Sequence, residues 1–113
     1  MHELSIVIEV ARRVEQIARE EKLTHVERIV LQVGELSSVI PGYLKQCYPA
    51  AVAGTILETT ELIIETLPGN VRCSDCGSIY RFLENRSDCP NCGSDRRELL
   101  CGREFILKEI VAY

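Results

Sequence analysis

Apolar residues recur three and four positions apart near the start of the chain, and farther along they alternate with polar ones. The first pattern places hydrophobic side chains on one face and charged side chains on the other, so it predicts a helix over residues 4–22. The alternating pattern predicts strands over residues 26–33, 62–67 and 105–111. The chain therefore combines helical and strand patterns.

A second helix is predicted to begin at Pro41 and to end at Gly54. Proline suits the first turn of a helix, and glycine is favoured just beyond the last turn. Pro49 lies inside this segment. Because proline lacks an N–H group and its ring clashes with the preceding turn, we expect a kink or an early stop at that point.

The composition changes between the second and third predicted strands. Residues 71–100 contain seven apolar residues other than cysteine against ten charged ones. A segment so poor in apolar surface cannot offset its own ordering entropy, so something else must hold it. We therefore predict an α+β protein: a small mixed three-stranded sheet with two helices, and an inserted zinc-ribbon-like lobe. The expected division is 1–70, 71–101 and a final strand within 102–113 that returns to the first domain.

Charge and hydropathy exclude several classes of protein. Thirteen basic against seventeen acidic residues give a net charge of −4, whereas a nucleic-acid binder needs a basic face. No apolar run approaches the roughly 18 residues that a membrane span requires, and no signal-peptide pattern is visible. We expect a cytoplasmic protein without nucleic-acid or membrane partners. In that reducing compartment, cysteines ligate metals more often than they form disulfides.

Four of the six cysteines form two C-x-x-C-G elements, Cys73/Cys76 and Cys89/Cys92, separated by twelve residues. Two such pairs supply the four tetrahedral thiolates that Zn²⁺ accepts, so the spacing predicts a structural zinc site. Two disulfides are the less favoured alternative, and an iron–sulfur site would use the same ligands. A four-thiolate site leaves no open position for a water molecule, which excludes hydrolytic chemistry there.

The two remaining cysteines have structural interpretations. Cys47 lies on the expected buried face of the second helix and is interpreted as a small core residue. Cys101 follows the polar segment and is interpreted as a packed or partly exposed thiol. Of the two histidines, His25 is interpreted as a surface or turn residue at the start of the first strand.

The other histidine is the second residue of the chain. Met1, His2 and Glu3 together offer an α-amine, two backbone amides and an imidazole. Chelation through these nitrogens gives the square-planar field that suits Ni(II) and Cu(II), and the Glu3 carboxylate adds an outer hydrogen-bond acceptor. A histidine at this position is more often an ordinary exposed end residue, so the spacing alone leaves both interpretations open.

Several motifs occur together and in order along nearly the whole chain. They are Met1-His2-Glu3-Leu4-Ser5, Val33-Gly34-Glu35-Leu36-Ser37, Gly54-Thr55, Leu62-Ile63-Ile64-Glu65, the two C-x-x-C-G elements and Gly102. In these motifs the chain resembles the HypA/HybF family of nickel metallochaperones for [NiFe]-hydrogenase maturation. The opening M-H-E and the paired C-x-x-C-G elements are the most specific parts of the resemblance.

The resemblance implies nickel held by Met1 and His2, with Glu3 contributing its backbone and tuning the site, and zinc held by Cys73, Cys76, Cys89 and Cys92. It also implies three kinds of partner: a HypB-type maturation GTPase, the [NiFe]-hydrogenase large subunit and, for some members, urease-maturation proteins. Many relatives carry an acidic residue just after G-E-L-S, whereas this chain has Val39-Ile40-Pro41.

Two other classes of function remain as alternatives. A zinc-ribbon interaction module without metal delivery would use the same cysteines, but residues 71–100 carry five basic and five acidic residues and lack the basic charge of a nucleic-acid ribbon. An enzyme would need a nucleophile beside a histidine, a phosphate loop or a paired acid and base, and no such pattern emerges. We therefore predict that the chain is not an enzyme.

Overall fold

The computed structural model describes residues 2–113, and its first element is helix α1 (His2–Glu20). The helix begins and ends two residues earlier than the pattern predicted. At its end the Leu23 N–H donates to Ala18 O at 2.8 Å and the Lys22 N–H donates to Arg19 O at 3.3 Å. Lys22 has a φ of +55°, so these bonds form a Schellman cap without the usual glycine.

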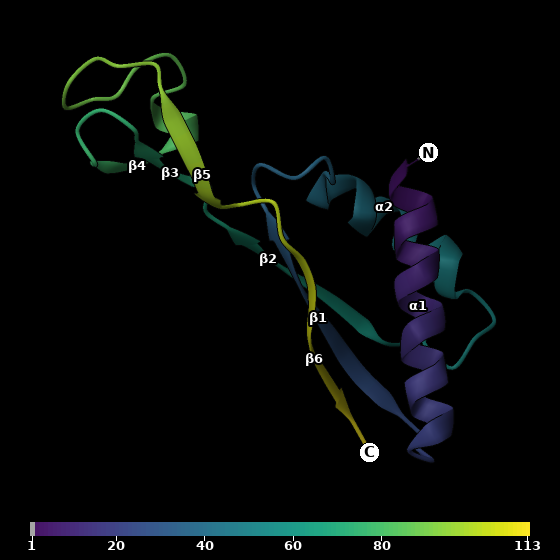
Figure 1. The fold of residues 1–113 in the computed structure, drawn as a ribbon. Coiled ribbons are helices and arrows are strands. Elements are labelled where there is room, and N and C mark those ends of the chain that lie inside the picture. The colour runs from purple at the N-terminus through teal and green to yellow at the C-terminus, as the bar shows by residue number, and fades with distance from the viewer. Residues whose placement is uncertain (1) are drawn as a thin grey trace.

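The main sheet has three strands in the order β2 (Glu61–Leu67), β1 (Val26–Gly34) and β6 (Phe105–Ala112). Strand β1 pairs in parallel with β2 and antiparallel with β6. The two helices lie on one side of this sheet (Figure 1). The predicted mixed three-stranded sheet with two helices is therefore confirmed.

Helix α2 (Pro41–Val52) runs through Pro49, so of the two outcomes predicted there, a kink or an early stop, the early stop is wrong. Pro49 and Lys45, four residues before it, are both exposed. Water can therefore reach this side of the helix and replace the hydrogen bond that Pro49 cannot donate. The helix ends where the pattern predicted, just before Gly54, which has a φ of +76°.

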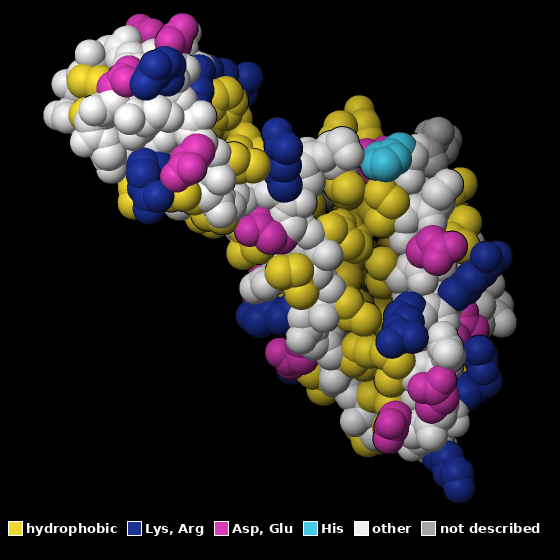
Figure 2. All heavy atoms as spheres, in the orientation of Figure 1, with side chains coloured by type: hydrophobic (Ala, Val, Ile, Leu, Met, Phe, Trp, Pro, Cys, Tyr) yellow, Lys and Arg dark blue, Asp and Glu magenta, His cyan; other side chains and the backbone are white. Residues whose placement is uncertain are grey.

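The hydrophobic core lies between the helices and the sheet. Its most buried members come from one face of α1, from β1, from α2 and from the segment after α2: Val7, Ala11, Val14, Ala18, Val26, Ile29, Leu31, Val33, Leu44, Val52 and Leu57. On β6 the matching side chains Phe105, Leu107 and Ile110 are only partly buried. Figure 2 shows hydrophobic side chains open to solvent along the gap between α1 and β6. The helices therefore cover β1 more completely than β6.

A second, smaller sheet forms the distal lobe. Its strands are β3 (Asn70–Cys73), β4 (Ile79–Arg81) and β5 (Arg97–Cys101), in the antiparallel order β4-β3-β5, followed after β4 by the 3₁₀ turn η1 (Phe82–Glu84). The sequence pattern did not predict these strands. Figure 1 shows the lobe projecting from one end of the main sheet. The molecule measures 55 × 27 × 16 Å.

Three glycines bring the two sheets together. A Cβ atom on Gly34 would lie 2.0 Å from Gly102 O, and one on Gly102 would lie 2.5 Å from Gly69 Cα. Across the same junction the Leu36 N–H donates to Gly102 O at 2.8 Å. The backbones approach too closely here for any side chain.

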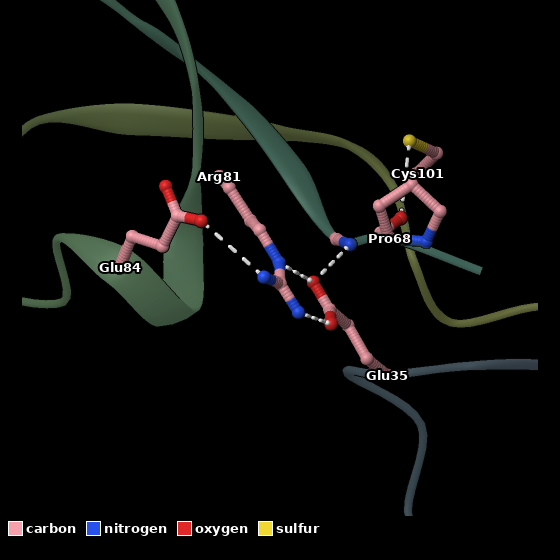
Figure 3. Close-up of polar contacts among 6 residues, drawn as sticks. Glu35, Pro68, Arg81, Glu84 and Cys101 are labelled. Atoms are coloured by element: carbon pink, nitrogen blue, oxygen red, sulfur yellow. Dashed lines mark hydrogen bonds and ion pairs between the residues drawn. The ribbon is translucent and has the colours of Figure 1, made fainter. Parts of the chain in front are cut away.

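An ion pair crosses this junction beside the glycines. Arg81 of the lobe donates from Nε to Glu35 Oε1 at 2.8 Å, and its Nη2 contacts Oε2 of the same carboxylate (Figure 3). The Gly69 N–H also donates to Glu35 Oε1, at 2.6 Å. The hydrogen bond from the Arg81 side chain has the largest effect on the Glu35 carboxyl, and the bond from the Gly69 N–H comes next. Together they lower the pKa of Glu35 to about 2. The G-E-L-S segment therefore anchors the lobe to the main sheet.

Within residues 2–113, neither helix has the length and apolar character that crossing a membrane would require.

Candidate metal centres

The four cysteines of the two C-x-x-C-G elements meet at the tip of the lobe. All four Sγ atoms lie within 4.8 Å of one another, with 3.5 Å between Cys73 and Cys92 and 3.6 Å between Cys76 and Cys89. A tetrahedral site with metal–sulfur bonds of about 2.3 Å requires sulfur atoms about 3.8 Å apart. The cluster therefore has the size and donor set of a four-thiolate metal site.

The two halves of the cluster have the same backbone geometry. The Gly77 N–H donates to Cys73 O at 3.0 Å, and the Gly93 N–H donates to Cys89 O at 2.9 Å. Both glycines have a φ of +78°, which other residues rarely adopt. In the second turn the Asn91 N–H also donates to Cys89 Sγ at 3.4 Å. Each C-x-x-C-G element therefore forms a tight turn that brings its two thiols together.

The neighbourhood of the thiols stabilises some charged sulfur atoms and destabilises others. Hydrogen bonds, the largest from the Asn91 side chain, lower the pKa of the Cys76 thiol to about 5. At Cys92 the Ser94 N–H lowers the pKa, but the Cys73 thiol and other neighbours outweigh it and raise the value to about 12. Four thiolates this close repel one another, so full ionisation requires a cation at their centre.

Contacts around the cluster join the two turns. The Ser94 hydroxyl donates to the Asp75 carboxylate, and the same carboxylate pairs with Arg96 at 2.8 Å. Cys101 is half-buried outside the cluster, and its thiol donates to Pro68 O at 3.6 Å (Figure 3). The structure therefore agrees with the interpretation of Cys101 as a packed thiol.

On the main body of the molecule, His2 is the first residue of α1, and Met1 lies outside the described residues. His2 is exposed, and its Nε2 lies 3.5 Å from Ser38 Oγ. Glu3 is only 8% exposed, and its carboxylate accepts a hydrogen bond from the Ile40 N–H at 3.3 Å. Both contacts come from the loop between β1 and α2, so that loop holds the first turn of the helix.

A hollow of about 340 Å³ opens beside this turn. It is lined by His2, Glu3, Tyr43, Gln46 and Cys47. Cys47 belongs to the hydrophobic core as predicted, at 8% exposure, and it also forms part of the wall of this hollow. His25 lies elsewhere, at the start of β1, with its ring 5.1 Å from that of Tyr113.

The sequence did not predict the contact of Ser38 with His2 or the ion pair between Glu35 and Arg81. Ser38 contacts a residue 36 positions away, and Glu35 contacts one 46 positions away. Hydrophobic periodicity carries no signal for contacts at such separations. Glu35 was part of the G-E-L-S motif, but nothing in the motif identifies its partner.

The two sheets and the cysteine cluster define a small α+β metal-binding protein with a zinc-ribbon-like lobe. Comparison with known proteins gives the family. A family model described as "Hydrogenase/urease nickel incorporation, metallochaperone, hypA" matches residues 1–112. The chain belongs to this HypA family, whose members are metallochaperones and not enzymes.

Curated relatives extend over most of the chain. Hydrogenase maturation factor HypA of Streptomyces avermitilis is 42% identical over 107 residues, which are 93% of this chain and 82% of the relative. The protein of the same name from Chlorobium luteolum is 34% identical over 111 residues, 98% of this chain and 95% of the relative.

Two solved structures share the fold at lower identity. The Ni metallochaperone HypA from Helicobacter pylori has a TM-score of 0.65 at 20% identity and covers 97% of this chain and 96% of its own. Another HypA solution structure has a TM-score of 0.70 at 21% identity, and the match covers 100% of this chain and 97% of that structure's chain.

Proposed function

We propose that this chain binds Ni(II) at its N-terminus and delivers it during [NiFe]-hydrogenase maturation. The ligands would be the Met1 amine, the backbone amides of His2 and Glu3, and the His2 imidazole. The observation that carries the proposal is that His2 and Glu3 lie in the first turn of α1. The first four N–H groups of a helix have no acceptor within it, so the amide nitrogens of His2 and Glu3 are available to a metal.

The electrostatics of the helix end support amide ligation. A helix N-terminus carries a partial positive charge, which opposes a bare cation and favours negative groups. An amide nitrogen that binds Ni(II) loses its proton and becomes negative. Two such amides would place negative charge at the end of α1 where the helix dipole stabilises it, and they would also balance the charge of the metal.

Side-chain contacts indicate different roles for His2 and Glu3 in binding the metal. A six-membered chelate joins the His2 amide to Nδ1 of its own ring, which leaves Nε2 on the side of Ser38, 3.5 Å from its hydroxyl. The Glu3 carboxylate is directed to the Ile40 N–H, so Glu3 would serve through its backbone. Because protons compete with the metal for the amine and the imidazole, nickel capture should weaken as pH falls.

Calorimetric titration of Ni(II) into the untagged protein tests this assignment. The His2→Ala variant should lose binding, and the His25→Ala variant should retain it. A chain lengthened before Met1, in which the amine becomes a peptide nitrogen, should also lose binding. Unchanged nickel affinity in either the His2 variant or the lengthened chain would overturn the proposal.

We also infer that Cys73, Cys76, Cys89 and Cys92 hold Zn²⁺, which would stabilise the lobe without taking part in chemistry. The spacing of the sulfur atoms and the two matched turns support this. Metal analysis of the purified protein should find one equivalent of zinc, which Cys73→Ser removes and Cys101→Ser retains. An iron–sulfur absorption spectrum instead of bound zinc would contradict the assignment.

The proposed division of the chain follows the two metals. Residues 1–70 with 102–113 would form the nickel domain, and residues 71–101 the zinc lobe. The partners would be a HypB-type GTPase, the [NiFe]-hydrogenase large subunit and, where present, urease-maturation proteins, all in the cytoplasm. Family membership and the two separate candidate metal centres support this organisation. Co-purification with a HypB-type GTPase tests whether the lobe takes part in docking. A larger loss of co-purification in the Cys73→Ser variant than in the His2→Ala variant would support that role.

A further inference from the structure

A groove lies at the junction between the main sheet and the lobe, built from both. One hollow of about 340 Å³ is lined by Leu36, Val71, Phe82, Arg97, Leu99 and Arg103. A second, of about 450 Å³, shares Leu36 and Arg103 with it and continues along Ser37, Ser38 and Val39. We call the two together the junction groove. Figure 2 shows hydrophobic, basic and acidic side chains on this connection.

The floor of the groove is apolar. Val71 of β3 and Leu99 of β5 are paired across the lobe sheet, so their side chains lie on the same face. Leu99 is 39% exposed, although strand β5 belongs to a sheet with its own small core. Leu36 closes the floor from the main-sheet side. Such a floor favours a hydrophobic side chain over a freely hydrated ion.

The walls of the groove carry two guanidinium groups. Arg97 lies with its Cζ 5.0 Å from the centre of the Phe82 ring and donates to Arg86 O at 2.9 Å. Among residues 2–113, neither Arg97 nor Arg103 has a carboxylate within the 4.0 Å of an ion pair. No acidic side chain lines either hollow, in a chain of net charge −4. The groove is therefore a local basic site on an acidic protein.

We propose that the junction groove binds an extended acidic segment of a partner protein. Its carboxylates pair with Arg103 and Arg97, whose planar guanidinium groups suit bidentate contacts, and a hydrophobic side chain between them rests on Leu36 and Leu99. A nucleic acid fits less well, because two arginines on a negatively charged protein cannot replace the counterions of a phosphate backbone.

The position of the groove gives the binding a consequence that rests on the proposed nickel function. Ser38 lines the second hollow, and its hydroxyl lies 3.5 Å from His2 Nε2. A segment that lies along the groove therefore leads from the lobe to the N-terminus of α1. A metal-binding side chain on that segment would arrive beside the proposed nickel ligands, which places the recipient where ligand exchange can occur.

Titration of ¹⁵N-labelled, metal-loaded protein with a capped peptide of alternating glutamate and leucine tests the docking. Amide shifts should concentrate at Leu36–Val39, Leu99 and Arg103. The Arg103→Glu variant should bind this peptide about ten-fold more weakly, the loss expected for one charged hydrogen-bonded contact. Arg13→Glu, a matched charge reversal on the exposed face of α1, should leave the affinity unchanged.

Three results would overturn the proposal. The first is an absence of shifts in the groove, or shifts that Arg103→Glu leaves intact. The second is equal binding of a lysine–leucine peptide of the same length. The third is that inorganic phosphate or a short oligonucleotide produces the same shifts, which would define a simple anion or nucleic-acid site.

Failure of the nickel proposal would give a different pattern. Arg103→Glu should keep full Ni(II) affinity, since the side-chain hydrogen bonds of the described ligand residues His2 and Glu3 go to Ser38 and Ile40 and not to Arg103. His2→Ala should keep the affinity for the acidic peptide. A peptide-binding protein that takes up no nickel would leave the groove standing and remove only the N-terminal metal site.

Discussion

Replacing Gly34 by alanine should disrupt the junction between the two sheets. The new Cβ would lie 2.0 Å from Gly102 O and 2.3 Å from the carbonyl carbon of the same residue. Ordinary van der Waals contact begins near 3.4 Å. The backbones must therefore separate by more than an ångström, and no flexible side chain is available to yield instead.

The structure gives the size of the effect. Overpacking costs about 1–3 kcal/mol, and separating the strands also breaks the hydrogen bond from the Leu36 N–H to Gly102 O, which contributes about 1 kcal/mol. The expected loss is about 2–4 kcal/mol. For a chain of this size each kcal/mol lowers the melting temperature by about 4 °C, so Gly34→Ala should melt about 8–16 °C below the parent.

Gly42→Ala is the matched control. Gly42 lies near the start of α2, with nothing within 4 Å of the position its Cβ would take. Alanine is the better helix former, so this variant should be as stable as the parent or more stable by up to about 1 kcal/mol. Thermal and urea unfolding followed by circular dichroism measure both. A Gly34→Ala protein within about 0.5 kcal/mol of the parent would refute the close backbone approach.

Two further predictions follow from other elements. The Glu35 carboxylate has a pKa of about 2 against an ordinary 4.5, so its pairing with Arg81 stabilises the fold above pH 4.5 and is lost as pH falls toward 2. The urea midpoints of the parent and Arg81→Gln should therefore differ by a constant amount between about pH 8 and pH 5, and a gap that closes within that range would contradict this. Pro49→Ala should raise the stability by about 1–2 kcal/mol, because the roughly 3 kcal/mol penalty of an interior proline exceeds its roughly 1 kcal/mol restriction of the unfolded chain. A lower melting temperature for that variant would show that the turn before Pro49 depends on the proline.

Periodicity was sufficient to predict α1 and β1 because each has one buried face, whereas α2 was predicted from Pro41 and Gly54 at its ends. Val7, Val14 and Ala18 repeat at helical spacing, and Ile29, Leu31 and Val33 alternate, since burial selects those positions directly. The end of α1 was misjudged because its cap uses Lys22 at a positive φ where glycine is usual.

The lobe strands escaped prediction for a different reason. Strand β4 has three residues and β5 has a mostly exposed face, so neither produces a hydrophobic alternation long enough to recognise. Their positions depend on the cysteine turns and on the junction glycines. The cysteine spacing did predict that four thiols would meet, because that signal lies in residue type and not in burial.

The junction also determines which functions can be separated by mutation. Val71, Phe82, Arg97 and Leu99 belong to the lobe, whereas Leu36 and the Ser37–Val39 loop belong to the main body. Any change that unfolds the lobe therefore removes one side of the groove, while the helix end at His2 keeps its contacts with Ser38 and Ile40. A lobe that loses its metal should accordingly lose the acidic peptide before it loses nickel. The contacts of Glu35 with Arg81 and Gly69 limit how far the two functions can be separated. They hold the lobe against the end of β1, which the Ser37–Val39 loop follows.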